Sequence, residues 1–318
     1  MQINEPPEPA PAQGTPGVRC RCCAGGVSRS IRTRCYPSDM TEAEWVVTEP
    51  VLPAPGWTAG KGGRPAEHCR RDVVDAIRYL VKEGIQWRAM PADFPHWRTV
   101  YDYADGWEKT GATEGMHDEL RRQCRVAASR EPEPTAAVID SQPVKAAETV
   151  GKPSRGYDAG KKINGRKRHI AVDTIGLLLT VLVTAASAQD RDGAKPLLWN
   201  LRKAFPAVRL TWADGSYAGK LVTWAKTKLK PRLNLEIVRR PDDLHTFQVL
   251  PRRWVAERTL AWITRCRPAV RDHERLPEHH QTFVYWAMVI TMTRRLDRRL
   301  PAAQPAATQV PAGSASHT

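Results

Sequence analysis

The stretches that decide the fold are TAAVIDSQ, residues 135–142, and RLTWADGSYAG, residues 209–219. Each contains a short apolar run of the kind that forms a buried β-strand, and each run closes at an aspartate, Asp140 or Asp214. A later stretch, RRWVAERTLAW, has the spacing of an amphipathic helix and carries Glu257. Two strand-end aspartates and one helical glutamate can converge on a pair of hard divalent cations, because such cations prefer oxygen ligands.

The sequence around these stretches predicts an α/β domain with a mixed central sheet. RHIAVDT and LLLTVLVTAA flank Gly176 and read as a β-hairpin, and the segment GAKPLLWNLRKA reads as a helix. A further helix is expected from about Tyr217 to Lys228, then the strand LEIVRR, and the last major helix is expected to begin near Arg253. Ligand sites in open sheets gather at strand ends, where Asp140 and Asp214 are expected.

Residues 36–128 have a helical pattern. Thr41 and Glu44 form a capping box that begins one helix. Apolar residues at helical spacing over residues 73–81 indicate a second helix, which is expected to stop at Gly84. A further helix is expected with Thr99 as its cap. Two readings stay open for this region: a helix-turn-helix-like DNA reader, or a plain helical bundle that packs against the rest of the chain.

Composition points to a polyanionic partner. The net charge is +15, from 49 Lys and Arg against 34 Asp and Glu, and such an excess attracts nucleic acid. No signal peptide or membrane segment is recognised, so a cytoplasmic location is expected. Residues 1–35 and 301–318, rich in small residues and Pro, are expected to be disordered. Their cysteines Cys20, Cys22, Cys23 and Cys35 have poor spacing for zinc and are read as free thiols.

The segment KPSRGYDAGKKINGRKR, residues 152–168, contains seven Lys or Arg and one acid. It lies between the first aspartate and the next strand, so it should flank the mouth of the site and hold phosphates without sequence preference. The alternative is a solvated loop beside the sheet. The candidate DNA-contacting residues are Lys161, Lys162, Arg166, Lys167 and Arg168.

Each acid also has a plain structural reading. Asp140 can cap a turn before Pro143, Asp214 can sit in an ordinary Gly-containing turn, and Glu257 can pair with Arg253 on the same helix face. Three further aspartates have similar local surroundings and compete with the first two: Asp173, Asp190 and Asp192.

The sequence around the three acids resembles that of the insertion-sequence DDE transposases, specifically the insertion-sequence-five family. The similar stretches include YPSDMTEAEW, VIDSQPVKAAE, SRGYDAGKKINGRKRHIAVDTIGLLL, QDRDGA, WADGSYAGK and VLPRRWVAERTLAW, in the family's order over about residues 36–296. The resemblance implies an RNase H-like catalytic domain over residues 135–296, preceded by a helical DNA-binding domain. It also implies that Asp140, Asp214 and Glu257 are the catalytic, metal-binding acids.

The same resemblance implies a function. We expect two Mg²⁺ ions, or Mn²⁺, that serve cleavage at the element ends and strand transfer into target DNA. The expected partners are double-stranded DNA and a second copy of the chain, because two ends must be joined; a nucleoid-associated location follows. The motif places DNA contacts at Arg253 and Arg265, but departs from the family at Leu250 and Thr264. The alternatives are an RNase H-like nuclease that only hydrolyses, and a non-catalytic DNA-binding repressor or decayed copy.

Overall fold

The structure is a computed structural model that describes residues 34–54, 68–230, 233–238 and 253–299. The expected disordered arm, apart from its last two residues, and the expected tail lie outside this range. Cys20, Cys22, Cys23 and Leu250 also lie outside it, so the expectations on them are not addressed by the structure.

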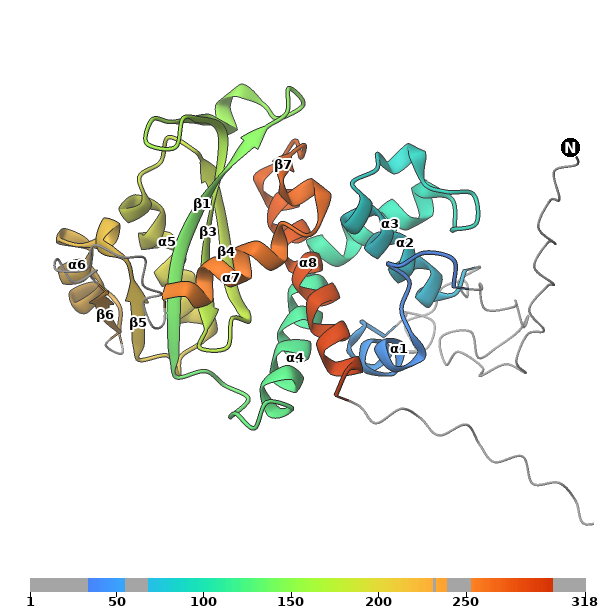
Figure 1. Cartoon of the computed structure of the whole chain (residues 1–318), viewed down its shortest axis with the longest axis horizontal. Helices are drawn as coiled ribbons and strands as arrows, with labels where there is room; N and C mark the ends of the chain where they lie inside the picture. The colour runs from blue at the N-terminus through green and yellow to red at the C-terminus, as the bar shows by residue number, and fades with distance from the viewer. Residues whose placement is uncertain (1–33, 55–67, 231–232, 239–252, 300–318) are drawn as a thin grey trace, which may run out of the picture.

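A curled mixed sheet forms one half of the molecule (Figure 1). Its central strand β1, Ala136–Ala146, pairs antiparallel with β3, Ile163–Asp173, and parallel with β5, Leu210–Ala213. Strands β2 and β4 pair antiparallel with β3, β6 lies parallel to β5, and β7 pairs with the far end of β1. Their bounds are Gly156–Asp158 for β2, Leu178–Ala185 for β4, Asn234–Ile237 for β6 and Arg271–Asp272 for β7. The predicted α/β class with a mixed sheet is confirmed.

The predicted hairpin around Gly176 is present as β3 and β4. Gly176 has φ +84°, a left-handed conformation that glycine adopts without the penalty a Cβ would bring. The carboxylate of Asp173 closes the turn by accepting hydrogen bonds from the backbone N–H groups of Ile175 and Leu177, at 2.9 and 2.8 Å. The hairpin therefore follows from local sequence alone.

Helices cover both faces of the sheet. Since side chains alternate between the faces along each strand, every strand can contribute to the core on either side. Ala137 and Ile139 of β1 pack into a core with α5, Asp190–Ala204, and α6, Lys220–Lys228. Val138 belongs to the core of the opposite face, which contains residues of α4, α7 and α8. The two faces of β1 are thus both buried, which explains its continuous apolar run.

The N-terminal region is helical, as predicted. Its helices are α1, Glu42–Thr48, α2, Arg70–Glu83, α3, Trp97–Lys109, and α4, Ala112–Val126, with short 3₁₀ turns at Glu49–Val51 and Trp87–Ala89. The capping box of Thr41 and Glu44 is confirmed, and α2 ends at Gly84 in the left-handed conformation. The predicted cap at Thr99 is wrong: the cap is His96, three residues earlier, and its ring accepts a hydrogen bond from the Arg98 backbone N–H.

Two helices end the described chain, and the expectation that the helix near Arg253 is the last major one is wrong. Helix α7, Arg253–Ile263, is followed by the longer α8, Pro277–Asp297. Helix α8 is apolar around most of its circumference, so it lacks the one-sided periodicity that marks a surface helix. It packs against β4 on one side and against α1, α2 and α4 on the other.

A buried polar contact joins the N-terminal helices to α8. The Arg78 guanidinium donates to Glu44 Oε1 at 2.7 Å and to Thr293 Oγ1 at 2.9 Å. All three side chains are almost fully buried.

In the part of the chain that the structure describes, no helix, α8 included, is long and apolar enough to cross a membrane. The division into domains at about residues 128–135 stays a prediction.

Candidate active site

Asp140 and Asp214 lie in the same register on neighbouring parallel strands. Val138 of β1 pairs with Trp212 of β5, so Asp140 and Asp214 are each two residues further along. Side chains two residues apart point to the same face, and neighbouring strands are about 4.8 Å apart. Both aspartates line one small cavity of about 10 Å³, together with Val238 after β6. The space is about that of a single water molecule.

The local settings of the two aspartates differ. Strand β1 continues past Asp140 and through Pro143 to Ala146, so the reading of Asp140 as a cap of a turn before Pro143 is wrong. The prediction that Asp140 ends its strand is therefore wrong. It lies within β1, two residues beyond the last pair that β1 makes with β5. The backbone N–H of Ser141 donates to Asp140 Oδ1 at 2.7 Å.

Asp214 does follow the end of its strand, and it also caps the 3₁₀ turn Gly215–Tyr217. Its Oδ1 accepts hydrogen bonds from the backbone N–H and the hydroxyl of Ser216, at 2.8 and 2.5 Å. The turn reading of Asp214 is thus correct, but it does not compete with a role in a site, because the cap fixes the carboxylate at the edge shared with Asp140.

Glu257 is exposed on α7, which crosses the face of the sheet over β1 and β3 (Figure 1). The Thr259 hydroxyl donates to the carbonyl oxygen of Gly176 at 2.7 Å, and Arg258 donates to that of Ile175 at 3.0 Å. These bonds fix α7 on the face to which Val138 and Asp140 point. The side chain of Arg253, the alternative partner of Glu257, lies outside what the structure describes.

The structure brings Asp140 and Asp214 together but does not close a three-acid cluster. Among the described residues, no group of three or more His, Cys, Asp or Glu side chains is close enough to hold a metal ion. Glu257 is on the same face as the two aspartates, but it does not complete a cluster with them in this conformation.

The predicted basic patch divides into an exposed part and a buried part. Lys161 and Lys162 are exposed at the β2–β3 turn, and Arg265 is exposed after α7. Arg166, Lys167 and Arg168 are at most 5% exposed, because they belong to the middle of β3 and have partners inside the protein. The prediction that the segment contacts DNA can therefore apply only to its exposed part, and the alternative of a solvated loop is wrong for residues 166–168, which are buried in β3.

The partners of the buried cations are specific. Arg166 forms an ion pair with Asp272 at 2.9 Å, and Lys167 contacts Asp158 at 2.9 Å and Asp190 at 3.1 Å. Arg168 donates a hydrogen bond to the side-chain oxygen of Gln142. The ion pairs explain how Arg166 and Lys167 are accommodated in the interior, since buried charges require paired partners. Arg168 is different, because it contacts a neutral amide and its Nε and one terminal nitrogen make no hydrogen bond in the described part of the chain.

Comparison with known proteins identifies the family. Residues 131–292 match the family model described as "Transposase DDE domain". The chain belongs to the DDE transposase family. Residues 40–117 match a second model, described as "Putative transposase of IS4/5 family". The predicted family is thereby confirmed, and the mixed sheet with its flanking helices is consistent with the RNase H-like fold expected of it.

One curated relative supports the same assignment. The chain is 26% identical over 108 residues, 32% of its own length and 69% of the other, to the "Insertion element IS402 uncharacterized 16.2 kDa protein" of Burkholderia cepacia. No solved structure matches.

The three competing aspartates are now distinguished. Asp173 is fully buried and pairs with Arg125 at 2.5 Å, so it has a structural role in the fold. Asp192 is exposed and pairs with Lys195. Asp190 accepts a hydrogen bond from the hydroxyl of Ser141 at 2.8 Å, and is thus linked to the neighbour of Asp140. Sequence reasoning missed this link; the only signal was that Asp190 lies in the family-like stretch QDRDGA.

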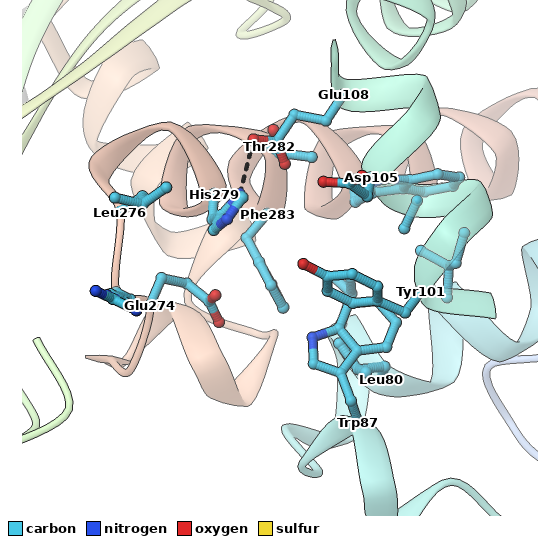
Figure 2. Close-up of a pocket in the computed structure, with 15 residues that line it drawn as sticks. Leu80, Trp87, Tyr101, Asp105, Glu108, Glu274, Leu276, His279, Thr282 and Phe283 are labelled. Carbon is cyan, nitrogen blue, oxygen red and sulfur yellow. Dashed lines mark hydrogen bonds and ion pairs between the residues drawn. The ribbon is translucent and has the colours of Figure 1, made fainter. Parts of the chain in front are cut away.

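A larger cavity lies elsewhere in the described part of the chain. It has a volume of about 510 Å³ and is lined by residues of α2, α3 and α8 and of the segment before α8 (Figure 2). Figure 2 shows the ion pair of His279 with Glu108, at 2.7 Å, and the carboxyl of Glu274 facing the same space. Burial raises the pKa of Glu274 to about 7, and the hydrogen bond to Glu108 raises the pKa of His279. None of the predicted site residues lines this cavity.

Proposed function

We propose that this chain is the transposase of an insertion sequence, which cuts DNA at the element ends and joins the freed ends to target DNA. The observation that carries the proposal is the shared register of Asp140 and Asp214 on parallel strands, in a chain with a DDE transposase domain. Two carboxylates that line the same cavity of about 10 Å³ suit a small hard cation with oxygen ligands.

Asp140 and Asp214 are proposed to hold the metal, and Glu257 is proposed to complete its protein ligands. A bound Mg²⁺ or Mn²⁺ pair would neutralise developing charge on the attacking and leaving oxygens of the phosphodiester. The chain itself contributes fixed carboxylates on a sheet and a third acid on a helix that lies across the same face. Closing the site then requires that Glu257 approach the aspartates when DNA binds, because no three-acid cluster is present in the described residues.

DNA binding is proposed to use the exposed cations. Lys161, Lys162 and Arg265 can contact phosphates, because they are solvent-accessible and the whole chain carries a net charge of +15. The prediction for Arg253 is kept on the motif alone. Arg166, Lys167 and Arg168 are not proposed as contacts, since they are engaged inside the protein. The helical region before the sheet is proposed to contact the element ends, and two copies are proposed to act together on two ends.

The proposal is tested with purified protein and linear DNA that contains the gene's flanking inverted repeats. In Mg²⁺ we expect new 3′-hydroxyl ends at the repeat boundary and, with a supercoiled target plasmid, joined products. Cleavage without joining would support a nuclease that only hydrolyses. Binding without cleavage in either Mg²⁺ or Mn²⁺ would support a non-catalytic repressor or decayed copy, and would contradict the proposed activity.

A further inference from the structure

Lys167 is a buried cation with a complete set of acceptors. Its ammonium contacts Asp158 Oδ2 at 2.9 Å, Asp190 Oδ1 at 3.1 Å and the carbonyl oxygen of Ala188 at 2.9 Å. An ammonium has three N–H donors, so these three contacts satisfy it. Burial opposes its charge, but the hydrogen bonds to Asp158 and Asp190 outweigh burial and raise the pKa of Lys167. The side chain therefore stays charged and fixed in place.

Asp190 links the Lys167 ammonium to strand β1. It is the first residue of α5, and its Oδ1 accepts both from Lys167 and from the hydroxyl of Ser141, the latter at 2.8 Å. The start of α5 is itself held close to β3: a Cβ added to Gly193 would stand 2.2 Å from the ring of His169. Such close packing leaves the Asp190 carboxylate little freedom to move relative to the sheet.

Ser141 connects the contact to the candidate catalytic carboxylate. Its side chain points to the α5 face, whereas Asp140 points to the opposite face, because side chains alternate along a strand. The backbone N–H of Ser141 donates to Asp140 Oδ1 at 2.7 Å. The hydrogen bond to Asp190 thus fixes the residue whose amide orients Asp140.

Tyr217 lies next to the same group of carboxylates. It is 1% exposed and ends the turn that Asp214 caps. Burial, together with the negative charge of Asp140, holds the pKa of Tyr217 well above its usual value, with smaller effects from Asp190 and Asp214. A neutral phenol therefore packs in the core on the α5 side of the sheet, close to the aspartates.

We propose that Lys167, Asp190 and Ser141 are positioning residues that hold the Asp140 carboxylate ready for a divalent cation; this inference rests on the proposed metal-dependent function. The contacts run without a break from Lys167 to Asp190, Ser141 and Asp140. Partners of metal-ligating carboxylates commonly change metal affinity by about 10- to 100-fold when they are removed. Lys167 thus supports the position of the Asp140 carboxylate from the α5 side of the sheet, opposite to the face to which Asp140 points.

The test measures Mn²⁺ affinity of the full chain by electron paramagnetic resonance, together with DNA cleavage as a function of Mn²⁺ concentration. Ser141→Ala removes the shared hydroxyl, and we expect the Kd for Mn²⁺ to rise at least about threefold; Lys167→Met should raise it about tenfold. Lys167→Arg should restore part of the affinity. The Mn²⁺ concentration that gives half-maximal cleavage should rise by the same factors in each variant. The cleavage rate at saturating Mn²⁺ should equal that of the wild type.

Ser154→Ala is the matched control. The Ser154 hydroxyl accepts from buried Arg166 at 2.7 Å, so its loss disturbs a buried cation of the same strand outside the proposed contacts. We expect the melting temperature to fall and the Kd for Mn²⁺ to stay unchanged. Wild-type affinity in Ser141→Ala and Lys167→Met, or an equal loss in Ser154→Ala, would overturn the positioning role. If Lys167→Met does not fold, Ser141→Ala alone decides. Absence of Mn²⁺ binding by the wild-type chain, even with element-end DNA bound, would instead overturn the proposed function and the inference with it.

Discussion

Asp140 and Asp214 stand at equivalent positions of two adjacent parallel strands, both two residues beyond the pair Val138–Trp212. The paired strands bring the two residues to the same edge of the sheet, and the cap of the turn Gly215–Tyr217 then fixes the Asp214 carboxylate there. Glu257 is placed differently, on a helix that lies across the sheet. Two fixed acids and one acid on a separate element suit a site that is partly preorganised and is completed when substrate binds.

The exposed lysines should contribute to DNA affinity through phosphate contacts. Changing Lys161 and Lys162 together to Gln should weaken DNA binding and make the slope of log K against log salt less negative by about 2, since each contact releases about one counterion. The same double change at Lys226 and Lys228, which are exposed on α6, should leave the slope unchanged. Fluorescence anisotropy at several salt concentrations measures both. An unchanged slope in the first variant would exclude this contact.

Asp173 should matter for stability and not for chemistry. Asp173→Asn leaves the buried Arg125 without its anionic partner, so the free energy of unfolding should fall by about 3 kcal/mol or more. Urea unfolding measures this change. Asp192→Asn, at an exposed position, should have almost no effect. A loss of less than about 1 kcal/mol in Asp173→Asn would show that the ion pair is not structural.

The cavity between α2, α3 and α8 should make stability depend on pH. Burial, with Asp272 nearby, raises the pKa of Glu274 from its usual 4.5 to about 7. The folded state therefore favours the protonated carboxyl. Its stabilising contribution is complete below pH 4.5 and is lost as the pH rises through about 7.

Glu274→Gln mimics the protonated form at every pH. At pH 8 we expect the variant to exceed the wild type in free energy of unfolding by on the order of 2 kcal/mol, with the difference shrinking towards pH 4.5. Glu278→Gln, at an exposed position on α8, is the control and should show no such trend. Urea unfolding at a series of pH values gives the curve. A difference that is constant with pH, or that grows as the pH falls, would contradict the assignment.

Glu257 should be required for cleavage but not for folding. Because its side chain is exposed, Glu257→Gln should keep the wild-type melting temperature and DNA affinity. Cleavage of element-end DNA in Mg²⁺ should fall by at least about a hundredfold, because the third acid is lost. Glu148→Gln, also exposed, should cleave normally. Substantial cleavage by Glu257→Gln would remove this residue from the site.

Local sequence rules predicted the elements that local interactions determine. The hairpin needed a residue with positive φ, and Gly176 supplies it; the first helix needed a capping box, and Thr41 with Glu44 supplies it. Helix α8 was missed because it is buried on several sides and has no apolar stripe to read. The mid-strand position of Asp140 was missed because Pro143 suggested a turn, although β1 continues through it.

The buried cations could not be recognised from their own segment, although it contains one of the two acidic partners of Lys167, Asp158. The partner of Arg166 is Asp272, 106 residues later, and Lys167 is paired with Asp190, 23 residues later. A run of Lys and Arg without those partners reads as a surface patch, because charged side chains are rarely buried alone. The register that brings Asp140 beside Asp214 likewise depends on strand pairing across 74 residues, which no local pattern encodes.

The central claim is that Asp140 and Asp214 form one metal-binding unit for strand cleavage. The most direct measurement is the rate of Mg²⁺-dependent cleavage of element-end DNA by Asp140→Asn, by Asp214→Asn and by the double variant, with Asp192→Asn as the control and with DNA affinity measured in parallel. We predict that each single change lowers the rate by at least about a thousandfold at unchanged DNA affinity, and that the double variant is no slower than either single one, as for residues that act together. Wild-type cleavage by either single variant, or losses that multiply in the double variant, would contradict the claim.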